Sequence, residues 1–150
     1  MYLLLIYMQE KNYLKFLFGH RRFIYTYTKH HKHIGGYIMS LILAPIVDGK
    51  METWKQWATD LKDSRAEEFK EFNTRYRLIR HSAWLAETPA GPVVAALHEG
   101  PGSDNFMSEI ATSDHDFDVW FKQSISEFHN IDFSQPLPGA PPQLLLNAVA

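Results

Sequence analysis

The feature that most constrains the fold of this chain is an abrupt change of composition at Met39. The first 38 residues contain no alanine, aspartate, valine, proline or tryptophan, yet they hold six of the seven tyrosines. They carry six basic residues and one acidic residue (net +5), whereas the remainder carries nine basic and 16 acidic residues (net −7). Because so sharp a shift marks a boundary, we expect one folded domain over residues 39–150 and an atypical extension over residues 1–38.

The extension lacks the features of a targeting or membrane segment. Its opening run, MYLLLIYM, has no basic start and no cleavage site, and QEKN interrupts it well short of the ~20 apolar residues that a membrane span needs. Its bias toward Phe, Ile, Tyr, Lys, Asn and His is typical of translated AT-rich sequence, so we expect a disordered or non-native segment. Its interleaved cations and aromatic rings leave open an arm that contacts nucleic acid or a membrane surface.

The bulk composition excludes several kinds of site. A length of 150 residues suits one domain. The absence of cysteine excludes disulfides, thiolate nucleophiles and cysteine-based metal sites, and it is compatible with the cytoplasmic location that we expect. A formal net charge of −2 gives no electrostatic reason for a polyanionic partner. We therefore expect no membrane partner and no nucleic-acid partner for the folded domain.

Hydrophobic periodicity predicts a strand followed by a long helix at the start of the domain. The run LILAPIV, residues 41–47, is typical of a strand that is buried on both faces. Asp48 is placed to cap a helix over residues 50–75, where apolar residues recur at helical spacing. The polar segment KDSR indicates a kink or a change of register near Asp63–Ser64.

An antiparallel hairpin is predicted next. Residues 76–88 and 93–99 have strand character, and TPAGP between them is a short turn with proline and glycine. GPGSD ends the second strand, and we expect Ser103 or Asp104 to cap a short helix.

A second long helix and a last strand complete the pattern. Ser113 and Asp116 have the spacing of a capping box, and an apolar stripe continues the predicted helix to about Phe128. The proline-rich segment SQPLPGAPP is predicted to be a linker. QLLLN, residues 143–147, is the candidate last strand.

The order of these elements predicts a ferredoxin-like α+β fold. A βαββαβ chain with right-handed crossovers forms a four-stranded antiparallel sheet with both helices on one face. The other face would expose side chains such as Trp84, an apolar patch larger than monomers usually carry. Pairing two such faces about a two-fold axis removes the patch from water, so we expect a homodimer through the sheet face.

Four blocks of the sequence resemble a known family. They are LAPIVDGKMETWKQW, RHSAWLAETPAGPVVAALHEG, SDHDFDVWFKQSISEFHNIDFS and PPQLLLN, and the resemblance that they carry extends over residues 39–147. In this order they are similar to small uncharacterised bacterial proteins of the dimeric α/β-barrel (ferredoxin-like) group. The resemblance implies the fold and a dimer, but no reaction. The wider group includes cofactor-free monooxygenases and haem-degrading enzymes, whose Asn/Trp/His constellation has no residue-by-residue match here.

The hairpin supplies the candidate catalytic residues, His81 and His98. An imidazole beside an aromatic wall can act as a general base toward an acidic C–H or O–H group. His81 and Trp84 have opposite parity on their strand, so only one of them can face the helices. The alternative is structural, with His98 a hydrogen-bonded residue at the strand end.

Two further sets of residues are candidates for binding. Six aromatic residues could line an apolar pocket between the helices and the sheet: Trp54, Trp57, Trp84, Phe117, Trp120 and Phe121. The carboxylates and imidazole of SDHDFD could suggest a divalent metal, but acids are favoured in any first helical turn by the helix dipole. We therefore expect no metal and no cofactor.

Three functions follow from these candidates. We expect a protein that binds a partner or an apolar small molecule, because catalytic groups do not converge in the sequence. The first alternative is a cofactor-independent monooxygenase or isomerase that acts on a hydrophobic substrate. The second is nucleic-acid contact through the basic extension. The sequence does not decide whether the protein is an enzyme, and it identifies no substrate.

Overall fold

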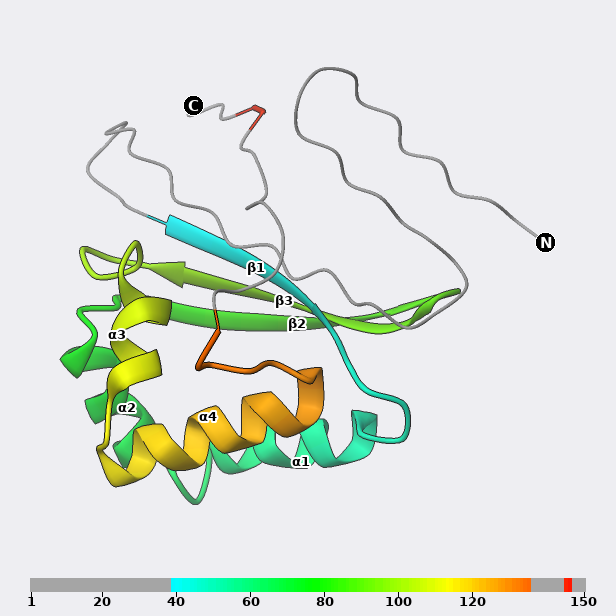
Figure 1. Cartoon of the computed structure of the whole chain (residues 1–150), viewed down its shortest axis with the longest axis horizontal. Helices are drawn as coiled ribbons and strands as arrows, with labels where there is room; N and C mark the ends of the chain where they lie inside the picture. Colours follow the sequence, from blue (N-terminus) through cyan, green and yellow to red (C-terminus); the bar gives the residue numbers. More distant parts are fainter. Residues whose placement is uncertain (1–38, 136–144, 147–150) are drawn as a thin grey trace.

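A computed structural model describes residues 39–135 and 145–146 of the chain. Within these residues the protein is a three-stranded sheet covered by four helices (Figure 1). The predicted extension, residues 1–38, lies outside the described residues, as does most of the proline-rich linker. No helix in the described part of the chain is long and apolar enough to span a membrane.

The sheet is built from β1 (Met39–Pro45), β2 (Arg80–Thr88) and β3 (Gly91–Glu99). The strand order is β1-β3-β2, and both pairings are antiparallel. The predicted hairpin is confirmed, because β2 pairs with β3 from Arg80↔Glu99 to Thr88↔Gly91. The first strand joins the free side of β3, with Met39 opposite Glu99, so β3 lies in the centre.

The predicted four-stranded ferredoxin-like fold with two helices is wrong. The described chain has three strands, and its four helices are α1 (Met51–Asp60), α2 (Ala66–Arg75), α3 (Phe106–Thr112) and α4 (Asp116–His129). The predicted last strand, residues 143–147, falls mainly outside the described residues. Its two described residues, Leu145 and Leu146, are exposed and belong to no strand.

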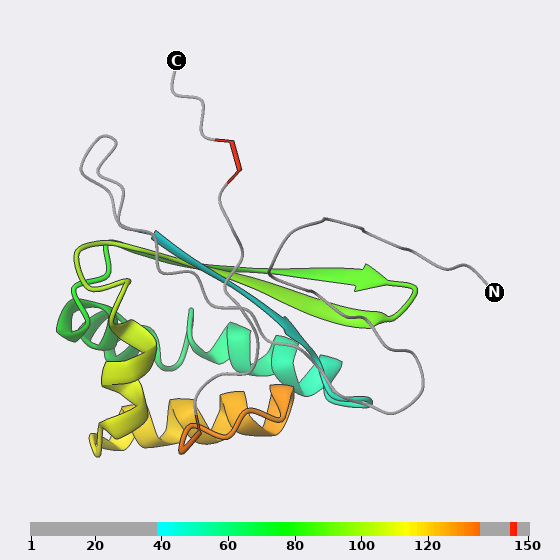
Figure 2. The ribbon, with the colours of Figure 1, turned by 45° about the horizontal axis from the view of Figure 1, so that its top comes forward.

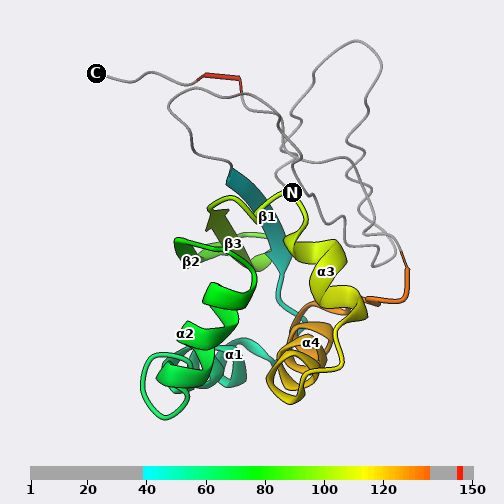
Figure 3. The ribbon, with the colours of Figure 1, turned by 90° about the vertical axis from the view of Figure 1, so that its left-hand side faces the viewer.

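The single helix predicted over residues 50–75 is two helices, separated at the polar segment that indicated a kink. Leu61 ends α1 as a buried residue, and the amide of Arg65 donates to the carbonyl of Asp60 at 2.8 Å, which closes the turn. No apolar side chain between Leu61 and Ala66 anchors a continuous helix to the sheet. Consequently α2 takes its own direction, and Figure 3 shows it running from the level of α1 back toward the sheet.

All four helices lie on one face of the sheet (Figures 1 and 2). Alternation along β1 sends Ile42 and Ala44 into the layer between the sheet and the helices, and leaves Leu43 exposed on the other face. The core that fills this layer is dominated by aromatic rings from α1, α2, α3 and α4, including Trp57, Phe72, Phe106, Phe117, Phe121 and Phe128. Among the described residues, one side of the sheet is therefore packed against helices and the other side carries no helix.

The residues that precede the helices differ from the predicted N-caps. Lys50, not Asp48, precedes α1, and Asn105 precedes α3, each without a side-chain cap. At α4 the N-cap is His115, whose Nδ1 accepts from the amide of Phe117 at 3.3 Å. Ser113 is instead the C-terminal cap residue of α3, and its hydroxyl donates to Asp118.

Two glycines bring the loop after β3 against the end of α2. A Cβ at Gly102 would lie 1.9 Å from the carbonyl oxygen of Tyr76, and one at Gly100 would lie 2.4 Å from that of Arg77. Both contacts are with backbone, so no side-chain movement could relieve them. The glycines of GPG therefore allow the close approach that sets α3 beside α2.

Candidate functional site

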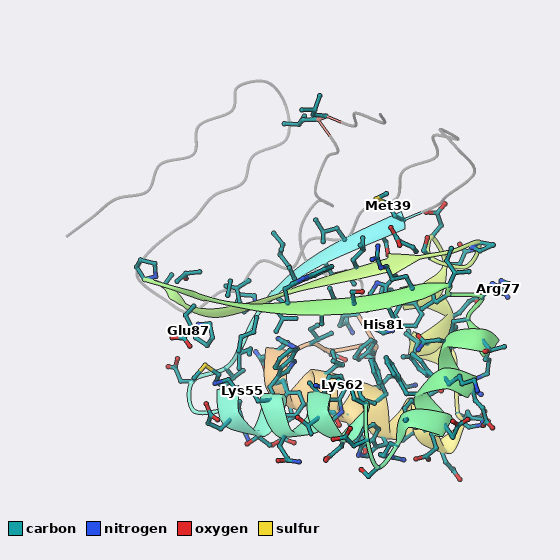
Figure 4. All side chains as sticks on the ribbon, turned by 180° about the vertical axis from the view of Figure 1, so that it is seen from behind. Met39, Lys55, Lys62, Arg77, His81 and Glu87 are labelled. Carbon is teal, nitrogen blue, oxygen red and sulfur yellow. The ribbon has the colours of Figure 1, made fainter. Side chains whose placement is uncertain are left out.

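A small groove opens between α1, α2 and the free edge of β2. Its volume is about 440 Å³, at the lower end of the range of small-molecule sites. The lining residues come from α1 and its following turn, from α2 and from β2: Trp54, Lys55, Ala58, Thr59, Lys62, Phe69, His81, Ala83 and Leu85. Figure 4 shows His81 on the helix side of β2, with Lys55 and Lys62 on the facing side.

The inner end of the groove leads into a buried line of polar side chains that crosses all three strands. The register places Ser40, His98 and His81 side by side on the helix-facing side of the sheet. Ser40 Oγ lies 3.3 Å from His98 Nδ1, and His98 Nε2 lies 3.2 Å from His81 Nε2. His81 Nδ1 then lies 3.0 Å from Oδ1 of Asn73 on α2.

The hydrogen bonds of this line fix where each proton lies. The amide nitrogen of Asn73 donates to the carbonyl of Phe69 at 2.8 Å, so its oxygen faces His81 and accepts from Nδ1. His81 Nε2 is then an acceptor, and His98 must donate to it from its own Nε2. That leaves His98 Nδ1 as the acceptor of the Ser40 hydroxyl. One hydrogen therefore lies between each pair of neighbours, and each hydrogen bond is donated in the direction from Ser40 toward Asn73.

Both imidazoles are uncharged at neutral pH. Burial lowers the pKa of His81 to about 4. Burial, and then the neighbouring His81, hold the pKa of His98 well below its usual value. The surroundings are apolar, because the His81 ring packs 5.1 Å from Phe69 and the His98 ring 4.5 Å from Phe106, centroid to centroid. An imidazolium there would lose its hydration without gaining a counter-charge.

This arrangement limits what the two histidines can do chemically. A general base needs a free lone pair within reach of the substrate and a pKa near the working pH. Each acceptor nitrogen of the pair is already occupied, His81 Nε2 by His98 and His98 Nδ1 by Ser40. His98 is also almost completely buried. The pair therefore organises the end of the groove rather than offering a proton acceptor to it.

The structure shows which residues of β2 face the helices, and it places the six predicted pocket residues in different environments. His81 faces the helices, so Trp84 points to the opposite face, where it is 54% exposed. Of the six predicted aromatic residues, Trp54 lines the groove. Trp120 is partly buried, with the Arg65 guanidinium 3.7 Å above its ring. The remaining three are in the core: Trp57, Phe117 and Phe121.

The acidic segment at the start of α4 makes a partly buried ion pair through Asp118. Asp118 is fully buried and accepts hydrogen bonds from three donors, Arg75 Nη2 at 2.7 Å, Tyr76 Oη at 2.6 Å and Ser113 Oγ at 2.6 Å. Burial alone would raise the pKa of Asp118, but these hydrogen bonds hold it below its usual value. Among the described residues, no group of three or more His, Asp or Glu side chains could hold a metal ion.

Four residues of the candidate site were not predicted from the sequence. Ser40 and Asn73 complete the polar line, and Lys55 and Lys62 stand at the groove. The strand parity of Ser40, shared with the inward Ile42, was a signal that it faces the core. Its partner depends on the β1–β3 register, which the sequence does not reveal.

A second depression lies on the outer side of α4, and it is less suited to a ligand. It is wider and more open, at about 670 Å³, and charges of both signs line it. Its cation, Lys122, donates to the carbonyls of Ala111 and Ser113 at 3.1 and 2.7 Å. We therefore take the groove beside β2 as the candidate site.

Comparison with known proteins gives no match. No protein-family model, curated protein or solved structure matches this chain. The resemblance drawn from the four sequence blocks therefore stays a prediction, and the function rests on the geometry of the site.

Proposed function

We propose that this protein binds a small, mainly apolar molecule in the groove between α1, α2 and β2, without transforming it. The observation that carries the proposal is the groove itself, where Trp54, Phe69 and Leu85 offer apolar walls beside a pair of histidines with no free lone pair. Apolar walls with few polar groups are typical of sites for small molecules.

The alternative, a cofactor-independent monooxygenase or isomerase, has less support. It requires His81 or His98 to remove a proton from the substrate. Both acceptor nitrogens are occupied, and the pKa of His81 is lowered to about 4, which makes it a weak base. Binding needs neither a free lone pair nor a change of protonation.

A substitution that fills the groove tests the proposal. Ala83 is an exposed residue of β2 that lines the groove, so Ala83→Phe should occupy it without crowding the core. We expect the full-length protein to bind 2-naphthylmethanol in a titration followed by NMR or calorimetry, and Ala83→Phe to abolish that binding. The matched control is Ala86→Phe, an exposed alanine on the other face of the same strand.

Two outcomes would contradict the proposal. One is the absence of measurable binding by the wild-type chain. The other is binding that survives Ala83→Phe, which would place the ligand elsewhere. Circular dichroism of each variant establishes that the fold is intact.

Two further expectations and one alternative remain part of the proposal. The free face of the sheet, with Leu43 and Trp84 exposed, supports a homodimer. A chain without cysteine is compatible with the reducing cytoplasm. Nucleic-acid contact through residues 1–38 concerns a segment outside the described residues.

A further inference from the structure

We propose that the ligand of the groove carries a negatively charged group, such as a carboxylate, on its apolar body, and that Lys62 receives that group. This inference rests on the proposed function. It names the chemical class of the ligand, an apolar or aromatic acid, which the apolar walls alone do not define.

The lining of the groove has cations but no acid. Lys55 and Lys62 are the two charged residues that line it, and no aspartate or glutamate does. A concave site lined by one sign of charge raises the local concentration of ligands of the opposite sign. Glu52 and Glu87, the two acids that raise the pKa of Lys55, lie outside the lining.

Most polar groups of the lining are already committed. Lys55 donates to Glu52 at 2.7 Å, and Glu87 also raises its pKa, so its charge is largely compensated. The hydroxyl proton of Thr59 is donated to the carbonyl of Lys55 at 3.0 Å. His81 donates from Nδ1 and accepts at Nε2, so neither ring nitrogen is open to a ligand.

Lys62 differs from these three. It lies in the turn after α1, and in the described part of the chain its ammonium group makes no ion pair. Its own backbone amide is used, donating to the carbonyl of Thr59 at 2.9 Å. The uncommitted charged group of the lining is therefore an ammonium, which favours a carboxylate over a neutral hydroxyl or amide.

The test compares an acid with its neutral analogue on the full-length protein at low salt. We expect 2-naphthoate to bind about fivefold more tightly than 2-naphthylmethanol, the size expected for an ion pair that water reaches. Lys62→Met should reduce this ratio to near one, whereas Lys62→Arg should retain it. Lys70→Met is the matched control, because Lys70 is an exposed lysine of α2 outside the groove.

Each outcome decides the inference separately from the proposed function. Equal binding of acid and alcohol, removed in both cases by Ala83→Phe, would overturn the inference and leave the function standing. Failure of both probes to bind would overturn the function as well. A preference for the acid that persists in Lys62→Met would show that Lys62 does not receive the charge. Loss of the preference as salt rises would support an ion pair.

Discussion

The imidazoles of His81 and His98 illustrate how single residues set the chemistry of this protein. Both lie in a layer of aromatic rings where an unpaired polar group would cost ~1–3 kcal/mol. Ser40 and Asn73 supply the missing partners, so each ring is held in one tautomer. A buried polar line that is fully satisfied in this way adds specificity, because any other register of β1 or β2 would break it.

The lowered pKa values predict that stability falls in mild acid. The folded-state pKa of His81, about 4, lies below the value near 6.5 expected in the unfolded chain. The unfolded state therefore binds the proton first as the pH falls. Stability is full above about pH 6.5 and is lost progressively toward pH 4, by roughly 3 kcal/mol for His81 alone. The lowered pKa values of His98 and His129 act in the same direction.

Urea unfolding of the full-length chain at several pH values between 7 and 4.5 measures this effect. The double variant His81→Leu/His98→Leu should show a clearly shallower dependence of the unfolding free energy on pH, because among the described histidines with a lowered pKa it retains His129 alone. An unfolding free energy of the wild-type chain that stays constant from pH 7 to 5 would contradict the prediction. The contribution of Asp118 lies in a lower window, because its lowered pKa affects stability only below about pH 4.

At the scale of elements, Asp118 connects the end of α2 to the start of α4. Its carboxylate joins Arg75 and Tyr76 to the first turn of α4, while Ser113 joins the end of α3 to the same group. Burial, and then the bond to Asp118, raise the pKa of Tyr76 to about 12, so the phenol stays protonated and donates. One buried charge therefore sets the relative position of three helices.

Asp118→Ala should destabilise the fold by roughly 3–5 kcal/mol, because it leaves Arg75, Tyr76 and Ser113 without their shared acceptor. Asp116→Ala is the control, since Asp116 is an exposed acid of the same helical turn whose loss should cost at most about 1 kcal/mol. Thermal or urea unfolding of the two variants measures the difference. Equal effects would show that Asp118 acts only through the helix dipole.

The element boundaries show what pattern could and could not predict. The hairpin was predictable because alternation and a Pro/Gly turn are local signals, and β2 pairs with β3 as expected. The break between α1 and α2 was predictable from a polar segment. The direction of α2 after the break was not, because it depends on how Phe72 and Tyr76 pack in the core. The cap predicted at Ser113 failed because its hydroxyl donates to Asp118. That carboxylate is held in place by Arg75 and Tyr76, which are more than 40 residues away in sequence.

The whole molecule has two unlike sheet faces. One face is covered by the helices (Figure 2). The other presents apolar side chains, of which Trp84 is 54% and Leu43 40% exposed. Their neighbours on this face are also apolar, since the register puts Ala95 between them and Leu97 beside Leu41. Apolar patches that join several strands are typical of interaction surfaces, which is why the homodimer stays a prediction.

We expect the full-length chain to sediment as a dimer at micromolar concentration and Trp84→Lys to shift it to a monomer, because a lysine cannot be buried without a partner. Ile79→Lys is the matched control, since Ile79 is a large apolar residue, 63% exposed, that precedes β2. A wild-type monomer at tens of micromolar would contradict the expectation. Dissociation by both substitutions would show that the effect is not specific to the sheet face.

The sequence alone determined the hairpin, the apolar stripes and the placement of His81 and Trp84 on one strand, because these depend on neighbours along the chain. The domain boundary at Met39 stays a prediction. Only the tertiary structure decided which of His81 and Trp84 faces the helices, that Ser40 and Asn73 complete the line, and that Lys62 stands uncommitted at the groove. Such features depend on strand register and on the direction of α2. Both are fixed by contacts between residues far apart in sequence, such as Ser40 with His98.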